Sequence, residues 1–327
     1  MKRREFITLL GGAAVVWPRA AVAQQPAMPV IGFLRADTPA AGADAVAAFR
    51  KGLSELGFVE GRNLAIEFRW GQNDRDRMPE LAADLIRRKV DVIAAPGSAV
   101  GALAAKALTT TIPIVFSTSG DPVELGLVQS LSRPGGNVTG FDDMRSELIR
   151  KHLGLLHELL PRAARFGVLT TRSYAFADRV TKDAQSAAIA IERQVDILFG
   201  DTDREIDAAF AEFVKMRVDA IVVIDDVVLA GRQTQILTLA ARHVLPAIYG
   251  SRPWAVTGGL MSYGPPLNDH ARQAGIYTGR ILKGEKPADL PVAQATRFEF
   301  IINLATARAI GLKMPPTLLA TADEVIE

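Results

Sequence analysis

Short runs of β-branched and aliphatic residues alternate along the chain with longer stretches of helical periodicity. The runs predict buried parallel strands, and the longer stretches predict helices that cover them. One helix presents Val46, Phe49, Leu53 and Leu56 on a single face and ends at Gly57. Strands are predicted at residues 30–34, 64–70, 90–95 and 112–117, with further helices starting at Met78 and spanning about 99–108.

The same alternation restarts in the second half of the chain. A loop at residues 133–137, with the sequence RPGGN, is followed by a predicted long helix to about residue 160. Strands are then predicted at residues 165–171, 195–200, 218–225, 246–250, 260–264 and 298–303, with a helix at 268–282, a crossover at 283–290 and a terminal helical segment. Two such series predict an α/β fold with two doubly wound lobes, each built on a parallel sheet.

The first residues form a separate unit with the pattern of an export leader. Lys2, Arg3 and Arg4 precede an apolar run at residues 6–16, and Ala21-Val22-Ala23 matches a cleavage site. A run this short does not span a bilayer, which needs about 20 residues. We predict a signal peptide at residues 1–23. Its RREFI sequence is similar to twin-arginine signals, with general secretory export as the alternative.

Composition excludes several classes of protein. The 327 residues are 49% hydrophobic and 23% charged, which suits two globular domains and not a disordered chain, a collagen or a coiled coil. The absence of cysteine excludes disulfides, thiolate metal sites, a cysteine nucleophile and a lipidated cysteine anchor.

Charge changes once the leader is removed. Four of the 38 basic residues and one of the 36 acidic residues lie in residues 1–23, which leaves 34 against 35. The net charge falls from +2 to −1, so a nucleic-acid partner is not expected. No later run reaches 18 apolar residues, and we therefore expect a periplasmic protein without stable membrane insertion.

Polar residues at predicted strand ends are candidate ligand contacts, because open α/β sheets bind ligands there. Gly97 and Ser98 join a strand to a helix whose first N–H groups favour an anion. Thr118 and Asp121 follow the next strand. Asp121 either holds a ligand ammonium group or caps a helix that begins at Pro122.

In the second half, Tyr174, Asp225 and Tyr263 lie at or near predicted strand ends. The pair Asp225-Asp226 could suggest acid–base chemistry, but no nucleophile elbow or suitably placed histidine accompanies it. The four histidines also lack the spacing of a metal site. We predict no catalytic residue, no metal and no cofactor.

Several segments resemble the tryptophan/tyrosine-type substrate-binding proteins of bacterial ABC importers. These segments are IPIVF at 112–116, GDP at 120–122, RPGGNVTG at 133–140, GGLMSYG at 258–264, ILKGEKPADLP at 281–291, INL at 302–304 and DEVIE at 323–327. The resemblance extends over essentially the whole chain. Residues 171–174 and 252–254 differ from the family pattern, so the expected ligand is stated only as a small polar organic solute, an amino acid or a related compound.

The resemblance implies a type I periplasmic binding protein fold with two lobes joined by about three crossovers. It places residues 24–142 and about 251–290 in the first lobe, and 143–250 and about 291–327 in the second. It implies a monomer that captures its solute between the lobes and delivers it to a membrane permease coupled to an ATPase. The contacts would be Ser98, Thr118 and Asp121 in the first lobe and Tyr174, Asp225 and Tyr263 in the second. An exported hydrolase-like enzyme and a ligand-sensing subunit remain alternatives.

Overall fold

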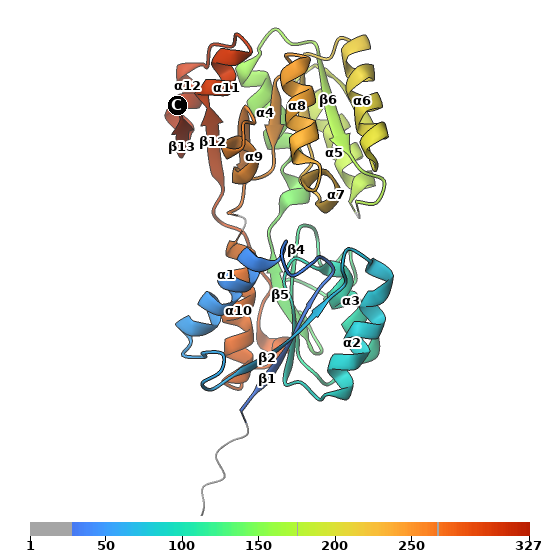
Figure 1. The fold of residues 1–327 in the computed structure, drawn as a ribbon, viewed down its shortest axis with the longest axis vertical. Coiled ribbons are helices and arrows are strands. Elements are labelled where there is room, and N and C mark those ends of the chain that lie inside the picture. Colours follow the sequence, from blue (N-terminus) through green and yellow to red (C-terminus); the bar gives the residue numbers. More distant parts are fainter. Residues whose placement is uncertain (1–27, 175, 267) are drawn as a thin grey trace, which may run out of the picture.

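The structure, a computed structural model, describes residues 28–174, 176–266 and 268–327. The predicted signal peptide lies outside these residues. Two α/β lobes, each with its own sheet, are stacked along the long axis of the molecule (Figure 1). This arrangement confirms the predicted fold class.

The first lobe is a parallel sheet in the strand order β11-β5-β4-β3-β1-β2. Its strands are β1 (Val30–Arg35), β2 (Ala65–Trp70), β3 (Val92–Ala95), β4 (Ile114–Thr118), β5 (Val138–Asp142) and β11 (Ala293–Gln294). Helices α1 (Ala43–Glu55) and α10 (Asp269–Leu282) cover one face, and α2 (Met78–Arg87) and α3 (Ala99–Leu108) cover the other. Short 3₁₀ turns occur at η1 (Arg75–Arg77) and η3 (Pro287–Asp289). Both faces of the sheet are therefore buried, as the near-continuous apolar strands predict.

The second lobe has the strand order β13-β12-β10-β9-β8-β6-β7, in which only the β10–β12 pair is antiparallel. Its strands are β6 (Arg165–Thr170), β7 (Gln194–Phe199), β8 (Ala220–Val223), β9 (Ala247–Tyr249), β10 (Met261–Gly264), β12 (Glu299–Asn303) and β13 (Glu324–Ile326). One face packs on α4 (Ile149–Leu159), α5 (Ala177–Ala190), α11 (Leu304–Ala309) and α12 (Pro316–Thr321). The other packs on α6 (Asp203–Lys215), α7 (Val227–Ala230), α8 (Gln233–Arg242) and α9 (Arg252–Val256).

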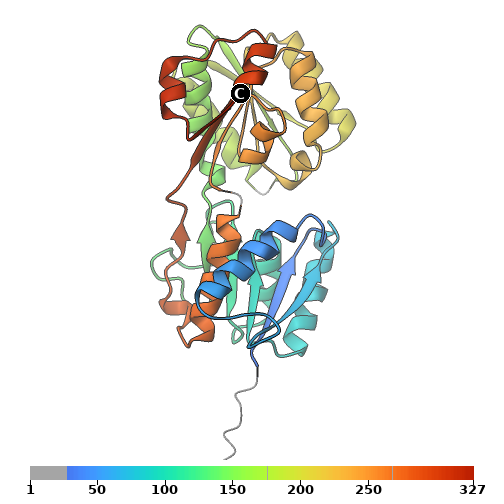
Figure 2. The same cartoon turned by 60° about the vertical axis from the view of Figure 1, so that its left-hand side comes forward.

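The chain passes between the lobes three times. The first crossover follows β5 and includes η2 (Arg145–Glu147), the second joins β10 to α10, and the third joins β11 to β12 (Figure 2). The sheets divide the chain differently from the sequence-based assignment. Strand β10 and helix α9 were expected in the first lobe but belong to the second. Strand β11 was expected in the second lobe but pairs with β5 in the first. Membership in a sheet depends on long-range pairing, which local periodicity does not contain.

Three local elements also differ from the prediction. Strand β5 occupies residues that were expected to lead into a long helix, and β13 ends a segment that was expected to be helical. Gly140 explains the first difference, because a Cβ there would lie 2.1 Å from the carbonyl oxygen of Phe116 in the neighbouring strand. Glycine has a low strand propensity, but this close approach between strands requires it. After Pro122 the chain forms turns and not a helix.

Candidate functional site

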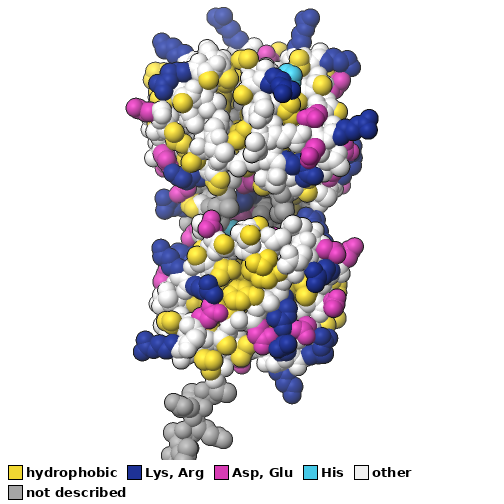
Figure 3. All heavy atoms as spheres, viewed as in Figure 1, with side chains coloured by type: hydrophobic (Ala, Val, Ile, Leu, Met, Phe, Trp, Pro, Cys, Tyr) yellow, Lys and Arg dark blue, Asp and Glu magenta, His cyan; other side chains and the backbone are white. Residues whose placement is uncertain are grey.

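The carboxyl ends of the parallel strands in both lobes face the seam between the lobes (Figure 1). The surface is hollowed along this seam (Figure 3). Loops that follow β3, β4 and β5 approach it from the first lobe, and loops that follow β6 and β8 approach it from the second. The seam is therefore the place where residues from both lobes can contact one ligand.

The first lobe brings hydroxyl groups and a helix N-terminus to its edge of the seam. Ser98 Oγ accepts a hydrogen bond from Gly101 N at 3.2 Å and caps α3, and Gly97 N donates to Ser117 Oγ at 2.6 Å. Thr118, only 4% exposed, ends β4, and within the described part of the chain its Oγ1 has no hydrogen-bond partner. A buried hydroxyl without a partner is unfavourable, so Thr118 is suited to a ligand that supplies one.

Three charged side chains meet where the first crossover approaches the second lobe. We call Asp143, Arg145 and Asp225 the hinge cluster. Arg145 Nε lies 3.3 Å from Asp143 Oδ2, and Arg145 Nη1 lies 3.3 Å from Asp225 Oδ2. Their side chains are 5%, 12% and 9% exposed, respectively. Trp254 Nε1 donates to the other oxygen of this carboxylate, Asp225 Oδ1, at 3.3 Å.

The charges of the hinge cluster influence one another's pKa values. Burial raises the pKa of Asp143, although Arg145 opposes this effect. Burial alone would lower the pKa of Arg145, but Asp143 and Asp225 raise it. One guanidinium thus lies between two buried carboxylates, and for Asp143 its charge favours the ionised form.

Tyr174 lies beside the hinge cluster in the second lobe. Burial, followed by the charge of Asp143, raises the pKa of its phenol, which therefore stays protonated. Its ring packs edge-on against Phe176, with centroids 5.6 Å apart. Nearby, Thr171 Oγ1 donates to Asp226, whose other carboxylate oxygen accepts from the backbone at the start of α7. Both carboxylates are therefore engaged by the protein: Asp226 by groups of the second lobe, and Asp225 by Trp254 and by Arg145 of the first crossover.

Two of the candidate residues have structural partners. Asp121 Oδ1 accepts hydrogen bonds from Val123 N and Glu124 N, at 2.8 and 3.3 Å, so this carboxylate closes the turn after Pro122. The ring of Tyr263 stacks on that of Phe298 at a centroid distance of 5.8 Å. The Asp121 carboxylate and the Tyr263 ring are therefore engaged by the protein itself.

The sequence did not single out Asp143, Arg145, Thr171 or Phe176. Asp143 and Arg145 follow β5, the strand that was not predicted, and therefore seemed to belong to a helix. The Asp142-Asp143 pair after an apolar segment was the available signal.

Asp142 lies next to the hinge cluster and joins two crossovers. Its Oδ1 accepts from Met144 N at 2.9 Å and its Oδ2 accepts from Gln294 Nε2 at 3.2 Å. Burial raises its pKa from 3.8 to about 6, and the charges of Asp143 and Glu147 add to this shift, whereas the two hydrogen bonds oppose it.

The raised pKa of Asp142 predicts a loss of stability as pH rises. A carboxyl group whose pKa is higher in the folded state holds its proton more tightly there, so its contribution declines between about pH 4 and pH 6. A shift of two pKa units corresponds to about 3 kcal/mol. Asp142→Asn should flatten this decline, measured as the urea-unfolding free energy across that pH range. The exposed control Asp44→Asn should keep the wild-type slope, and an equally steep decline in Asp142→Asn would contradict the assignment.

The two lobes contact each other directly across the seam, and we call this the closed arrangement. Arg75 Nη1 donates to the carbonyl oxygen of Ser173 at 3.1 Å, and Arg179 Nη1 contacts Glu124 Oε2 at 3.1 Å. Phe176 is 5% exposed, and its ring lies over Gly120. These contacts join the two lobes directly across the seam.

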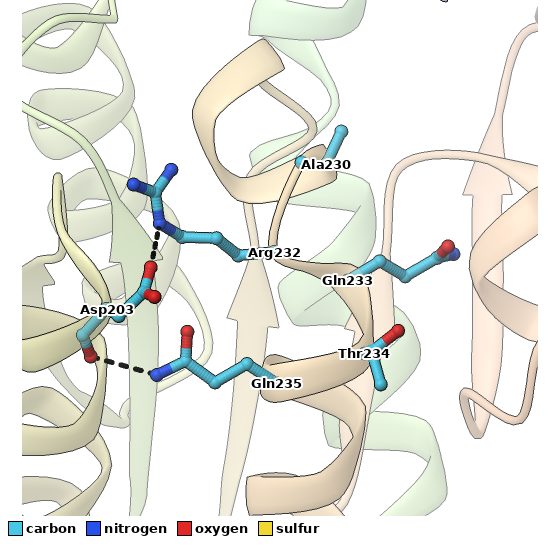
Figure 4. Close-up of a pocket in the computed structure, with 7 residues that line it drawn as sticks. Asp203, Ala230, Arg232, Gln233, Thr234 and Gln235 are labelled. Atoms are coloured by element: carbon cyan, nitrogen blue, oxygen red, sulfur yellow. Dashed lines mark hydrogen bonds and ion pairs between the residues drawn. The ribbon is translucent and has the colours of Figure 1, made fainter.

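A second hollow, of about 570 Å³, lies in the second lobe between the starts of α6 and α8. Figure 4 shows the side chains of Arg232 and Gln235 directed toward Asp203, while those of Gln233 and Thr234 point elsewhere. Arg232 Nε donates to Asp203 Oδ1 at 2.6 Å, and Gln235 Nε2 donates to the Asp203 carbonyl at 2.9 Å. These polar groups satisfy one another, so the seam is the better candidate for a ligand.

Residues 31–326 match the family model described as ABC transporter substrate binding protein. The chain belongs to this family. It is therefore the solute-binding component of an ABC transporter. A tyrosine-binding protein of Clostridioides difficile (strain R20291) is 30% identical to it over 265 residues, which are 81% of this chain and 76% of that protein.

Solved structures agree with the fold of this substrate-binding protein. An ABC domain in complex with L-Trp from Streptococcus pneumonia has a TM-score of 0.82 at 23% identity, covering 91% of this chain and 99% of that one. A ligand-free, open substrate binding protein from Clostridium difficile has a TM-score of 0.72 at 27% identity, with the same coverage.

Two features are absent from the described residues of the substrate-binding protein. None of their helices is both long and apolar enough to cross a bilayer. Among the same residues, no three or more His, Asp or Glu side chains are grouped so that they could hold a metal ion.

Proposed function

We propose that this substrate-binding protein captures a free amino acid or a related zwitterion between its lobes and delivers it, chemically unchanged, to a permease coupled to an ATPase. Export by the leader would place it in the periplasm as a monomer. The relative that is 30% identical is a tyrosine-binding protein, which supports an amino-acid ligand. The rest of the proposal is argued from the polar and charged groups at the two edges of the seam.

The first-lobe edge suits a carboxylate. The first N–H groups of α3 carry the positive end of the helix dipole, Ser98 caps this helix and Thr118 ends β4. Thr118 Oγ1 is buried and, within the described residues, unpartnered, which is the observation that points most directly to a ligand acceptor. A ligand carboxylate would accept a hydrogen bond from this hydroxyl.

The second-lobe edge suits an ammonium group. Asp225 lies in the loop after β8, and Trp254 Nε1 and Arg145 hold its carboxylate in place. Tyr174 adds an aromatic wall and a protonated phenol beside it. A zwitterion spanning the seam would place opposite charges against each lobe and would favour closure.

Titration calorimetry of the mature chain tests this proposal. L-Tyrosine and L-tryptophan should each bind saturably, whereas a neutral hexose and the amide L-tyrosinamide should bind much more weakly. Mass spectrometry of ligand recovered after incubation should find it unaltered. Altered ligand would favour the exported-enzyme alternative, and saturable binding of the hexose alone would contradict an amino-acid ligand.

Thr118→Val should weaken amino-acid binding about tenfold or more, because one hydrogen bond to a charged carboxylate contributes about 1.5 to 3 kcal/mol. Its folding stability should not fall, because within the described residues its hydroxyl has no partner to lose. Calorimetry and urea unfolding measure the two effects separately. Thr110→Val, at an exposed position in the same lobe, is the matched control. Unchanged affinity of Thr118→Val would remove Thr118 from the site.

A further inference from the structure

Phe176 of the second lobe and Gly120 of the first lobe are in tight contact across the seam. A Cβ added at Gly120 would lie 2.3 Å from Phe176 Cζ and 2.5 and 2.6 Å from its two Cε atoms. Real Cβ atoms do not approach other atoms so closely. The phenyl ring therefore occupies the space that any side chain at position 120 would fill.

The closest obstacle to a side chain at position 120 comes from the other lobe. Gly120 is not among the glycines with a left-handed backbone, so an alanine there is compatible with the local conformation. The three heavy atoms nearest to the added Cβ all belong to Phe176, which lies at the start of α5 in the second lobe. With the lobes apart, an alanine at this position would have room.

The phenyl ring is held in place within the closed structure. Phe176 is 5% exposed, and Tyr174 packs against its ring with an interplanar angle of 72°. Arg179 in the next turn contacts Glu124, just beyond Gly120. Phe176 and Arg179 are close in sequence, and so are Gly120 and Glu124. The Phe176–Gly120 and Arg179–Glu124 contacts therefore form together when the lobes close.

We propose that Gly120 is a socket for Phe176 and that their fit sets how readily the lobes close, and through closure the affinity for the solute. This inference rests on the proposed function, in which the solute binds between closed lobes. A ligand that binds a closed form has an apparent affinity reduced by the fraction of protein able to close. The fit of a single side chain across the seam would then act on affinity without touching the ligand.

Gly120→Ala should raise the Kd for L-tyrosine about tenfold in titration calorimetry, through a smaller closed population. Its urea-unfolding midpoint should stay at or above the wild-type value, because alanine lowers the entropy of the unfolded chain. Gly154→Ala, in α4 with nothing within 4 Å of the added Cβ, is the matched control and should bind as the wild type does.

A double-mutant cycle identifies Phe176 as the partner. Removing the ring by Phe176→Ala should free position 120, so that adding Gly120→Ala to Phe176→Ala should change the Kd by less than about twofold. A further tenfold loss in the double variant would show that Gly120 acts elsewhere and would overturn the proposal, as would a wild-type Kd in Gly120→Ala.

A ligand-free measurement separates this inference from the proposed function. The chain has no cysteine, so Glu124→Cys with Arg179→Cys provides a unique pair across the seam for a short bis-maleimide crosslinker. Its crosslinking rate reports how often the lobes close, and Gly120→Ala should slow this rate about tenfold. If no amino acid binds but the rate falls, the ligand assignment is wrong and the socket stands. Equal rates with and without Gly120→Ala would overturn the socket.

Discussion

Replacing Arg145 by methionine is expected to lower the free energy of unfolding by about 3 to 5 kcal/mol, the loss typical of a buried ion pair that is missing one partner. Methionine keeps much of the side-chain volume but removes the charge. Asp143 and Asp225 would then remain buried at the hinge without a cation. Urea unfolding at neutral pH measures the loss.

The pH dependence of the Arg145→Met variant tests the cause of this loss. Without the guanidinium, the already raised pKa of Asp143 should rise further, so lowering the pH should protonate this carboxyl and recover part of the stability. Arg150→Met, which removes an exposed arginine in α4, is the control and should change stability by less than about 1 kcal/mol. A similar loss in both variants, or a loss independent of pH, would argue against unpaired carboxylates as the cause.

Gly275→Ala is expected to lower the free energy of unfolding by about 3 kcal/mol, toward the upper end of overpacking effects. The Cβ would lie 2.2 Å from the carbonyl oxygen of Phe49 in α1, and a Cβ at Gly52 in α1 would lie 2.1 Å from the carbonyl oxygen of Arg272 in α10. Both obstacles are backbone atoms, so the two helices would have to separate along their contact. The measurement is again urea unfolding.

Gly154→Ala provides the control for this packing argument. It is also a helical glycine, but nothing lies within 4 Å of its added Cβ, so alanine should raise stability by up to about 1 kcal/mol through helix propensity. Opposite signs for the two substitutions would show that helix contact decides the outcome. A small gain in Gly275→Ala would mean that α1 and α10 are not packed this closely.

Local periodicity predicted most of the fold because each buried strand of a parallel sheet is a recognisable apolar run. The predicted helix at about residues 99–108 coincides with α3, and the runs at 30–34 and 165–171 coincide closely with β1 and β6. Strand β5 escaped prediction because Gly140 and Asp142 weaken its apolar pattern. Strands β10 and β11 join their sheets by pairing with strands that are far away in sequence. A pattern read over a few neighbouring residues therefore does not show to which lobe they belong.

The candidate site could be predicted only in part for a related reason. Strand ends indicated Thr118, Tyr174 and Asp225, and the structure brings the loops that carry them to the seam. Whether a polar group at a strand end is free or engaged depends on its neighbours in space. Asp121 is taken up by its own turn, and the ring of Tyr263 is stacked on Phe298. Arg145 was hidden because its partners come from two different parts of the chain.

The interleaving of the two lobes has a consequence for the order in which the chain folds. Strands β6 to β10 of the second lobe precede α10 and β11, which complete the first lobe by covering α1 and by pairing with β5. A nascent chain ending near residue 264 therefore has neither lobe finished, although it contains most of both. Many multidomain proteins fold from the N-terminus as they are synthesised. Here neither half can mature before nearly the whole polypeptide has been made.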